Sequence, residues 1–555
     1  MPFIQNYNPC HNLLLSTIFA SLPVLILFVM LVPMRLPAPW AAAGGAIAAL
    51  AVAMAVFGMP AHMAGLAFLN GALFGLMPIC WVIINAMLLY NITVETGRFE
   101  GIKRSVAGLS PDHRVQAVLI GFCFGAFLEG AAGGGTPVAI CAAMMVGLGF
   151  EPFLAAGLCL IANTSPVAYG GFGTPLLTLE SVTGIPARTL SAMAGNQLPF
   201  LSLIVPLWLV RCMCNWRETF EVWPAISVAG LSFAISQFCF AHSGAFPLTD
   251  IAGGLISLVV TGTFLVWWRP RQIWRFESYR AGRRQNEPNP APSSDGRVPL
   301  GVAVRAWAPF IILCVLMTAT GVYKNRLDAL RVGALHSVYE LRMPYLDQLV
   351  QRNPPVVERP SLESATWKFN WLTTPGTSVL LTVLISLAYL RPSRHQLRRS
   401  LARTYYQMRI PIPTIVCMLG LGSVTRLGGL DAALGMTFKH TGMVYPFFAA
   451  LLGWLGVFLT GTDAASNALF GSLQKITALQ LGLNPLLITV ANSTGGVMGK
   501  MIDAQSICVA TAATERVGSE ADVFKFVVWH SIALASIVGL LVFAQAYWLD
   551  WMVPR

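Results

Sequence analysis

The sequence is poor in charge. Only 11% of its 555 residues are Asp, Glu, Lys or Arg, against about 25% in soluble proteins, and 55% are hydrophobic. So few charges exclude an ordinary soluble globular protein, and the chain is predicted to be a polytopic membrane protein. Its net charge of +12 would suit nucleic acid, but the basic residues concentrate in short loops between apolar runs, where they are topology signals. No nucleic-acid partner is therefore expected.

Motifs of reactive or metal-binding chemistry are also missing. The 11 cysteines include no CxxC pair and lie mostly inside apolar runs, which argues against a disulfide framework and a metal site. The chain has no HExxH, GxSxG or Walker A pattern, so we expect no enzyme activity and no cofactor. The N-terminus lacks the basic region of a signal peptide, and the first apolar run is too long for one, so it is predicted to remain as a helix.

Apolar runs of transmembrane length recur from end to end. Ten unbroken runs predict membrane helices: Leu13–Met34, Ala38–Gly58, Met63–Tyr90, Leu190–Cys212, Val222–Ala241, Leu248–Trp268, Leu300–Tyr323, Leu372–Leu390, Ile410–Thr425 and Phe524–Trp548. An arginine-rich segment, 269–299, predicts a cytoplasmic linker between a first membrane half, 1–268, and a second, 300–555. The polar segment Lys324–Asn370 has little positive bias and is placed outside, opposite the basic loop Arg391–Arg409. Both termini are predicted on the periplasmic side.

Two further apolar stretches are interrupted. The first, Gly121–Pro175, is broken at Glu129–Pro137 and again at Asn163–Pro166, and the second covers about Tyr445–Met501. Three short sequences recur between them in order: GAFLEG and GVFLTG, LGFEP and LGLNP, and ANTS and ANST, at offsets of 331, 333 and 329 residues. Three matches in order argue for an internal repeat, and paired interrupted stretches are typical of a transporter site.

The two repeats are predicted to be inverted. Three spans precede each interrupted stretch, and the first set starts outside whereas the second starts inside, which implies an axis in the membrane plane. The first repeat covers about 13–212, and the helix pair Val222–Trp268 belongs to neither repeat. The arms Val115–Leu128 and Val138–Gly149 are shorter than the roughly 20 residues of a span, so each stretch is predicted to be a re-entrant hairpin followed by a discontinuous helix. The predicted fold is an all-α polytopic membrane protein with about twelve transmembrane helices.

The hairpin tips and helix breaks form the predicted substrate site. Irregular backbone at membrane depth occurs only where protein or a water-filled cavity surrounds it. Helix N-termini there offer unpaired N–H groups and partial positive charge, which suit a carboxylate. The predicted substrate-binding residues are Gly133, Gly134, Thr136, Asn163, Thr164, Ser165, Thr462, Ser466, Asn467, Asn492, Ser493, Thr494 and Lys500.

Glu129 and Asp463 are the predicted proton-coupling residues. An ionisable group inside the membrane points to function, and a buried carboxyl group can take up and release a proton. A structural ion pair, with Lys500 as partner, is the alternative. Lys500 either faces the substrate or is neutralised by Asp503, and Arg426 lies either in the site or at the membrane interface.

The interrupted stretches resemble the bacterial L-lactate permease family. The resemblance rests on GFCFGAFLEGAAGGGTPVAI, GLCLIANTSPVAYG, GWLGVFLTGTDAASNALFGSLQ and ANSTGGVMGKMIDAQSI, and it extends from NYNPCHNLLLSTIFASLPV to AQAYWLDWMVP. The chain departs from the family's usual residues at Gly134, at Ala464–Ala465 and at Asp503–Ala504. The resemblance implies proton-coupled uptake of L-lactate, D-lactate or glycolate across the bacterial inner membrane. It also implies a wider likeness to transporters built from inverted repeats, many of which work as elevators.

Other readings of the same residues stay open. Sodium-coupled carboxylate transport is the nearest alternative, because carbonyl groups at broken helices together with Asn and Ser also suit Na⁺. A membrane-embedded enzyme and an ion channel are weaker ones. The expected partners are a small monocarboxylate, H⁺ and membrane lipid, with a homodimer left open and no metal expected.

Overall fold

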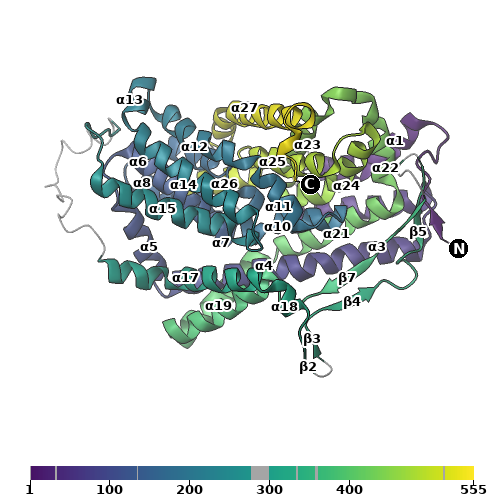
Figure 1. Ribbon diagram of the computed structural model, residues 1–555, viewed down its shortest axis with the longest axis horizontal. Coiled ribbons are helices and arrows are strands. Elements are labelled where there is room, and N and C mark those ends of the chain that lie inside the picture. Colours follow the sequence, from purple (N-terminus) through teal and green to yellow (C-terminus); the bar gives the residue numbers. More distant parts are fainter. Residues whose placement is uncertain are drawn as a thin grey trace.

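The protein is a polytopic helical membrane protein. The computed structural model describes residues 2–31, 34, 36–133, 136–276, 299–332, 335–354, 356, 360–516 and 519–554. Within these residues eight helices are long and apolar enough to cross a membrane, or ten if each of two bent helix pairs counts as one span. The helices form one body, with a few short strands at one end beside the N-terminus (Figure 1).

The first half opens with a helix pair, one long helix and one short helix. Its elements are α1 (Leu13–Leu31), α2 (Ala38–Ala55), α3 (Ala61–Phe74), the π-helical η1 (Gly75–Cys80), α4 (Trp81–Glu95) and α5 (Arg98–Ala107). α1 packs on α2. The segments α3, η1 and α4 join into one helix of 35 residues, with the π-helical turn at Pro78. Helices are therefore present where the three spans of this region are predicted; the third is longer than predicted and long enough to cross a membrane, whereas the apolar parts of the first two are shorter.

The second half opens in the same order. Its elements are α17 (Leu300–Val322), α18 (Lys324–Asp328), α19 (Pro375–Leu390), α20 (Arg394–Met408), α21 (Pro411–Gly428) and α22 (Leu430–Phe438). α20 and α21 join into a second helix of 35 residues. α17 packs on α19, α3 packs on α21, and α4 packs on α19 and α20. The two long helices therefore lie side by side and antiparallel.

The predicted basic loop between residues 391 and 409 is mostly helix α20. Ser393 and Gln396 form a capping box at its start, with the Gln396 backbone N–H donating to Ser393 Oγ at 3.2 Å and the Ser393 N–H donating to Gln396 Oε1 at 2.8 Å. Arginine, glutamine and leucine are good helix formers, so the segment has no reason to break. The Gln396 amide also donates to the carbonyl of Glu95 at 2.9 Å, which ties α20 to the end of α4.

Each interrupted stretch begins with a helical hairpin. Hairpin 1 consists of α6 (His113–Gln116), the π-helical η2 (Ala117–Phe124), α7 (Gly125–Ala132) and α8 (Thr136–Gly147), and hairpin 2 of α23 (Tyr445–Thr460) and α24 (Asp463–Leu481). α8 folds back along η2, and α24 folds back along α23. The helix breaks fall at the predicted tips. The first arm differs from the prediction, because His113–Ala131 is one buried helical run of 19 residues, long enough to cross a membrane.

A broken helix follows each hairpin. The elements are α9 (Pro152–Ala162), η3 (Val167–Tyr169) and α10 (Gly170–Thr183) in the first, and α25 (Pro485–Gly499) and α26 (Ala504–Ala513) in the second. The first bends by 63° at Asn163–Pro166, where the break is predicted. The second breaks at Lys500–Asp503, whereas Asn492–Thr494, the counterparts of Asn163–Ser165 in the repeat, lie inside α25. At an offset of 329 residues Pro166 corresponds to Gly495, so this copy lacks the proline that ends the helix.

The remaining helices complete the two halves. They are α11 (Ala187–Gly195), α12 (Leu198–Met213), α13 (Trp216–Glu221), α14 (Trp223–Ala241), η4 (Phe246–Leu248), α15 (Thr249–Trp267), η5 (Lys439–Val444), α27 (Glu520–Tyr547) and η6 (Asp550–Met552). α15 packs on α7 and η2, so the extra helix pair supports hairpin 1. Across the halves, α10 packs on α24, and α26 packs on α8 and α9. Of the predicted linker, only 269–276 and 299 are among the described residues.

Short strands form in the polar segment between α18 and α19 and at the N-terminus. They are β1 (Phe3–Ile4), β2 (Arg331–Val332), β3 (Leu335–His336), β4 (Tyr339–Arg342), β5 (Val350–Arg352), β6 (Ser361–Glu363) and β7 (Thr366–Phe369). β1 pairs in parallel with β5, with Phe3 opposite Val350. The N-terminus and this segment therefore share one face of the molecule, as the predicted topology requires (Figure 1).

Candidate functional site

Asp463, the first residue of α24, lies in the interior at the tip of hairpin 2. Its carboxylate accepts a hydrogen bond from Ser493 Oγ, and Asn467 Nδ2 lies 3.5 Å from the same oxygen, Oδ2. The other oxygen, Oδ1, has no hydrogen-bond partner among the described residues. Gly496 faces Oδ1 so closely that a Cβ there would lie 2.5 Å from it. One oxygen is thus held in place, and the other can accept a proton or a cation.

A chain of amide hydrogen bonds extends from this carboxylate through three helices. Asn492 Nδ2 donates to Asn467 Oδ1 at 2.9 Å, and Gln474 Nε2 donates to Asn492 Oδ1 at 3.3 Å. Tyr445 OH donates to Gln474 Oε1 at 2.9 Å. Asn467 Nδ2 also donates to the carbonyl of Pro175 at 3.1 Å. The cluster therefore joins hairpin 2 and α25 to α10, a helix of the first half.

Glu129, on α7 near the tip of hairpin 1, is the second buried carboxylate. Its side chain is only 4% exposed, and Oε2 has no hydrogen-bond partner among the described residues. Its electrostatic neighbours are Lys500, Asn163 and Asp503, together with Asp250 of α15. The side-chain amide of Asn163 interacts with the Glu129 carboxylate, but neither of its polar atoms makes a hydrogen bond of full geometry among the described residues. This centre holds more unpaired polar atoms than the one around Asp463, which leaves them available to a ligand.

A left-handed turn in α10 lets hairpin 1 approach the broken helix. Gly171, Phe172 and Gly173 have φ values of 52°, 63° and 71°, which only glycine adopts readily. A Cβ at the neighbouring Gly170 would lie 2.7 Å from Glu129 Oε1. Glycine is therefore required at position 170 by the close approach of the carboxylate.

Lys500 lies at the break between α25 and α26 and joins the second hairpin to it. Its Nζ donates to the carbonyl of Gly461 at 2.7 Å and forms an ion pair with Asp503 Oδ2 at 3.0 Å. The side chain is 3% exposed. Of the two alternatives that the sequence leaves open, the structure shows neutralisation by Asp503. Lys500 is a neighbour of Glu129 without being its ion-pair partner.

Ser466 belongs to the Asp463 cluster, since its Oγ accepts from Asn492 Nδ2 at 3.4 Å, whereas the other predicted site residues lie near the clusters without joining them. Thr494 Oγ1 donates to Gln197 Oε1 at 2.6 Å, toward α12, and Thr164 Oγ1 donates to the Ile161 carbonyl of its own helix at 2.8 Å. Thr462 Oγ1 caps α24. Ser165 Oγ has no partner among the described residues. Ser466 Oγ donates to the carbonyl of Gly453 at 3.1 Å, Gly133 caps α7, and Gly134 and the Thr136 side chain lie outside the described residues.

Asp250 is a buried carboxylate that the sequence analysis did not select. It is the second residue of α15 and fully buried, and neither of its oxygens has a hydrogen-bond partner among the described residues. It is also a neighbour of Glu129. The rule that selected Glu129, an acid inside an apolar run, applies equally to Asp250. It was overlooked because its helix belongs to neither repeat. Gln474 and Gln197, which bond to predicted residues, carry no signal beyond being polar in apolar helices.

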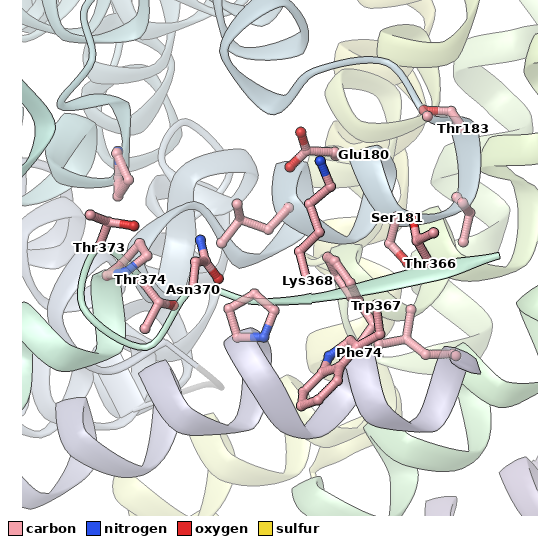
Figure 2. Close-up of a pocket in the computed structure, with 18 of the residues that line it drawn as sticks. Phe74, Glu180, Ser181, Thr183, Thr366, Trp367, Lys368, Asn370, Thr373 and Thr374 are labelled. Carbon is pink, nitrogen blue, oxygen red and sulfur yellow. The ribbon is translucent and has the colours of Figure 1, made fainter. Parts of the chain in front are cut away.

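The large cavity of the described structure is not at the hairpin tips. It has a volume of about 980 Å³ and lies where α3 and α21 face α10 and α24, beneath strand β7. We call it the β7 cavity. Figure 2 shows Glu180 of α10 and Lys368 of β7 projecting into it. Arg426, which the sequence left undecided between site and interface, lines this cavity and is half-buried.

Buried carboxylates between paired hairpins and broken helices, in a body whose helices expose apolar side chains such as Ile47, Ile235 and Leu540, are typical of membrane transport proteins. The sequence profile of the L-lactate permease family matches residues 16–549. The chain belongs to this family, and the predicted resemblance is confirmed.

Relatives of known name match along nearly the whole chain. The L-lactate permease of Salmonella typhimurium is 43% identical over 99% of both chains. A glycolate permease of Escherichia coli K12 is 43% identical over 98% of both, and an L-lactate permease of Bacillus subtilis is 40% identical over 100% of both. Among solved structures, the antimetabolite efflux pump MtrF of Neisseria gonorrhoeae shares 13% identity with a TM-score of 0.42, over 85% of this chain and 82% of its own. That similarity is too low to relate the two folds.

Proposed function

We propose that this protein takes up L-lactate and related small 2-hydroxymonocarboxylates, D-lactate and glycolate, together with protons across the bacterial inner membrane. The observation that carries the proposal is the pair of buried carboxylates, Glu129 and Asp463, beside the breaks of the two hairpins. The names of the relatives, L-lactate permease and glycolate permease, support the substrate class.

The packing supports two inverted repeats. Each half presents a helix pair, a helix of 35 residues, a short helix, a hairpin and a broken helix in the same order. The two long helices are antiparallel neighbours, as elements related by a two-fold axis in the membrane plane would be. On this proposal there are about twelve crossings with two re-entrant hairpins, both termini are periplasmic, and the linker 269–299 is cytoplasmic.

Asn163 is the best-placed side chain to bind the substrate. Its amide is buried, makes no hydrogen bond of full geometry among the described residues and lies beside Glu129 at the bend of the first broken helix. An amide can donate to a carboxylate and accept from a hydroxyl group, which are the two polar groups of a 2-hydroxy acid. Asn467, Asn492 and Ser493 offer the same chemistry around Asp463, although their donors are already engaged within the protein.

Proton coupling follows from the charge of the substrate. A monocarboxylate carries a charge of −1, and a membrane potential negative inside opposes its uptake by about 2.3 kcal/mol per 100 mV. One accompanying proton removes this opposition and adds the pH gradient as a driving force. Glu129 and Asp463 each have a buried oxygen without a hydrogen-bond partner among the described residues, so each can hold that proton.

Uptake of labelled substrate into vesicles, with proton and sodium gradients imposed separately, tests the proposal. We expect accumulation of L-lactate with the proton gradient alone. Glu129→Gln or Asp463→Asn should retain exchange of substrate between equally loaded compartments but lose accumulation, because a neutral amide cannot carry the proton. Accumulation that needs sodium would favour the alternative, in which the oxygens around Asp463 bind Na⁺. If both variants accumulate lactate with the wild-type pH dependence, neither residue couples transport to protons.

A further inference from the structure

The β7 cavity is lined by both basic and acidic side chains, and two of its basic residues come from helices that meet across it. The acidic ones are Glu180, Asp328 and Glu363. Arg426 is on α21 and Lys475 is on α24, and both line the cavity. They converge on the last turn of α10: Arg426 Nη1 donates to the carbonyl of Ser181 at 3.3 Å, and Lys475 Nζ donates to the carbonyl of Thr183 at 2.6 Å. The two cations are electrostatic neighbours of one another.

No carboxylate of the described residues forms an ion pair with either cation, although Glu363 is an electrostatic neighbour of both and Asp431 is one of Arg426. Among the described residues no acidic oxygen lies within ion-pair distance of Arg426 or Lys475, whereas the adjacent Arg352 pairs with Glu363 at 3.1 Å. Arg426 Nε is buried and has no hydrogen-bond partner among the described residues. A guanidinium group has five N–H donors and an ammonium group has three, so both side chains retain donors after binding their carbonyl groups. Half-buried cations such as these usually form an ion pair with a carboxylate, because removing a charge from water is costly.

The position of the β7 cavity is compatible with a path by which an anion from outside reaches the hairpin tips. It opens between the long helices, through α3 and α21, and the hairpin-bearing part, through α10 and α24. Leu177 lines it, two residues from Pro175, whose carbonyl binds Asn467 of the Asp463 cluster. The N-terminus closes on the same end, since Gln5 Nε2 donates to the carbonyls of Arg426 at 3.0 Å and Leu427 at 2.8 Å. An anion held here would be next to the predicted site without reaching it.

We propose that Arg426 and Lys475 form an outer binding site for the carboxylate of the substrate, which collects the anion before it moves to the hairpin tips. The identity of the substrate rests on the proposed function, whereas the affinity for a small carboxylate rests on the cavity alone. Two positive charges that face a cavity and have no ion-pair partner among the described residues attract anions and raise their local concentration. Their other donors are available to bind the two oxygens of a carboxylate.

Uptake kinetics of the reconstituted protein test the outer site. Arg426→Gln and Lys475→Gln should each raise the half-saturating concentration of external L-lactate at least tenfold and change the maximal rate less than twofold, since proton coupling lies elsewhere. Arg342→Gln, which removes an exposed arginine of β4 outside the cavity, should leave both values unchanged. Half-saturating concentrations within twofold of wild type in both cavity variants would overturn the proposal.

A labelling experiment keeps the test independent of transport and of the folding of these variants. Ser423 lines the cavity and its hydroxyl group has no partner among the described residues, so Ser423→Cys is a mild change. The exposed Cys239 and Cys508 are first replaced by serine, so that they do not react with the reagent. A negatively charged thiol reagent should react at least tenfold faster than a positively charged one of similar size, and L-lactate should slow it. Equal rates, or no protection by lactate, would overturn the outer site. A protein that is protected by lactate but takes up neither lactate nor glycolate would retain the outer site and refute the proposed function.

Discussion

At the scale of single residues, the buried polar side chains differ in how far their hydrogen bonds are satisfied. Ser493 and Ser165 are both fully buried, yet Ser493 donates to the Asp463 carboxylate, whereas the Ser165 hydroxyl group has no partner among the described residues. Bonds to a carboxylate are among the stronger ones, and leaving a buried acceptor without its donor is costly. Comparing the two serines therefore measures how much the hydrogen bond from Ser493 to Asp463 contributes to the free energy of unfolding.

We predict that Ser493→Ala lowers the free energy of unfolding by about 1–3 kcal/mol, because it leaves the Asp463 oxygen without its donor. Ser165→Ala should change this free energy far less, since no bond of its hydroxyl group is lost. Unfolding of the purified protein by a denaturing detergent in mixed micelles measures both. An equal loss in the two variants would mean that the Ser493 bond contributes nothing specific.

The buried carboxylates leave no room for a Cβ at two glycines, Gly170 beside Glu129 and Gly496 beside Asp463. At Gly496 an added Cβ would lie 2.5 Å from Asp463 Oδ1, and at Gly65 of α3 it would meet no atom within 4 Å. We predict that Gly496→Ala reduces lactate uptake at least tenfold by displacing the carboxylate, and that Gly65→Ala leaves uptake unchanged. Initial rates of uptake, normalised to the amount of protein in the membrane, compare the two. Wild-type uptake by the Gly496 variant would show that Asp463 tolerates displacement.

The sequence predicts which residues are polar in an apolar context better than it predicts where they point. Glu129, Asp463 and Ser493 stand out because such side chains are costly in hydrocarbon. Thr494 is next to Ser493, but a helix turns by about 100° per residue, so it faces Gln197, in the turn before α12. That direction depends on the rotation of α25, which no local pattern determines.

At the scale of elements, the contact between α23 and α25 is an unusually close helix crossing. A Cβ at Gly453 would lie 1.9 Å from the Asn492 carbonyl oxygen, and one at Gly495 would lie 2.1 Å from the Ala450 carbonyl oxygen. Small residues allow such close backbones in membrane helices, where packing replaces the hydrophobic effect. The crossing holds the end of α23 against α25, and Asp463, at the start of the following helix α24, accepts its hydrogen bond from Ser493 of α25.

We predict that Gly495→Ala destabilises the protein by about 1–3 kcal/mol, because the helices must separate to admit the methyl group. Gly301→Ala, at a helical glycine of α17 with no atom within 4 Å of the added Cβ, is the matched control. Thermal unfolding of the purified variants distinguishes them. A control that loses as much stability as Gly495→Ala would rule out the crossing as the cause.

Element boundaries were predictable where proline or glycine determines them. Pro166 marks the first break correctly, but the second occurs eight residues later than the repeat predicts, at a position without proline. The arginines of α20 predict a cytoplasmic loop when they are treated only as topology signals, but the segment is a helix. The same arginines are good helix formers, so charge and helix propensity pointed in different directions at one segment.

At the scale of the whole molecule, the proposed topology places three polar segments. We predict that single cysteines replacing Arg271 and Arg398 are labelled only from the cytoplasmic side, and one replacing Arg342 only from the periplasmic side. All three side chains are exposed, so access and not burial decides the result. A membrane-impermeant thiol reagent, applied to vesicles of each orientation, measures it. Labelling of all three from one side would refute the inverted arrangement.

The interlocking of the two halves was not predictable from the sequence. The repeat predicts that each half has a hairpin and a broken helix, but not that these elements exchange neighbours. In the structure α10 packs on α24, and α26 packs on α8 and α9. Such contacts depend on side-chain shapes far apart in the chain. The order of elements within one half therefore does not predict these contacts between the halves.

This exchange of neighbours has a consequence for the synthesis and membrane insertion of the protein. Hairpin 1 ends at Gly147, but its partner α26 begins only at Ala504. At the usual pace of about 5–20 residues per second, a ribosome needs roughly 20–70 seconds to reach it. During that interval Glu129 and Asn163 are already in the bilayer without the helix break that carries Lys500. The nascent first half therefore stays in the bilayer as an intermediate whose polar side chains lack their partners from the second half. A chain that terminates before α26 would keep this exposed polar centre, so we expect it to be degraded.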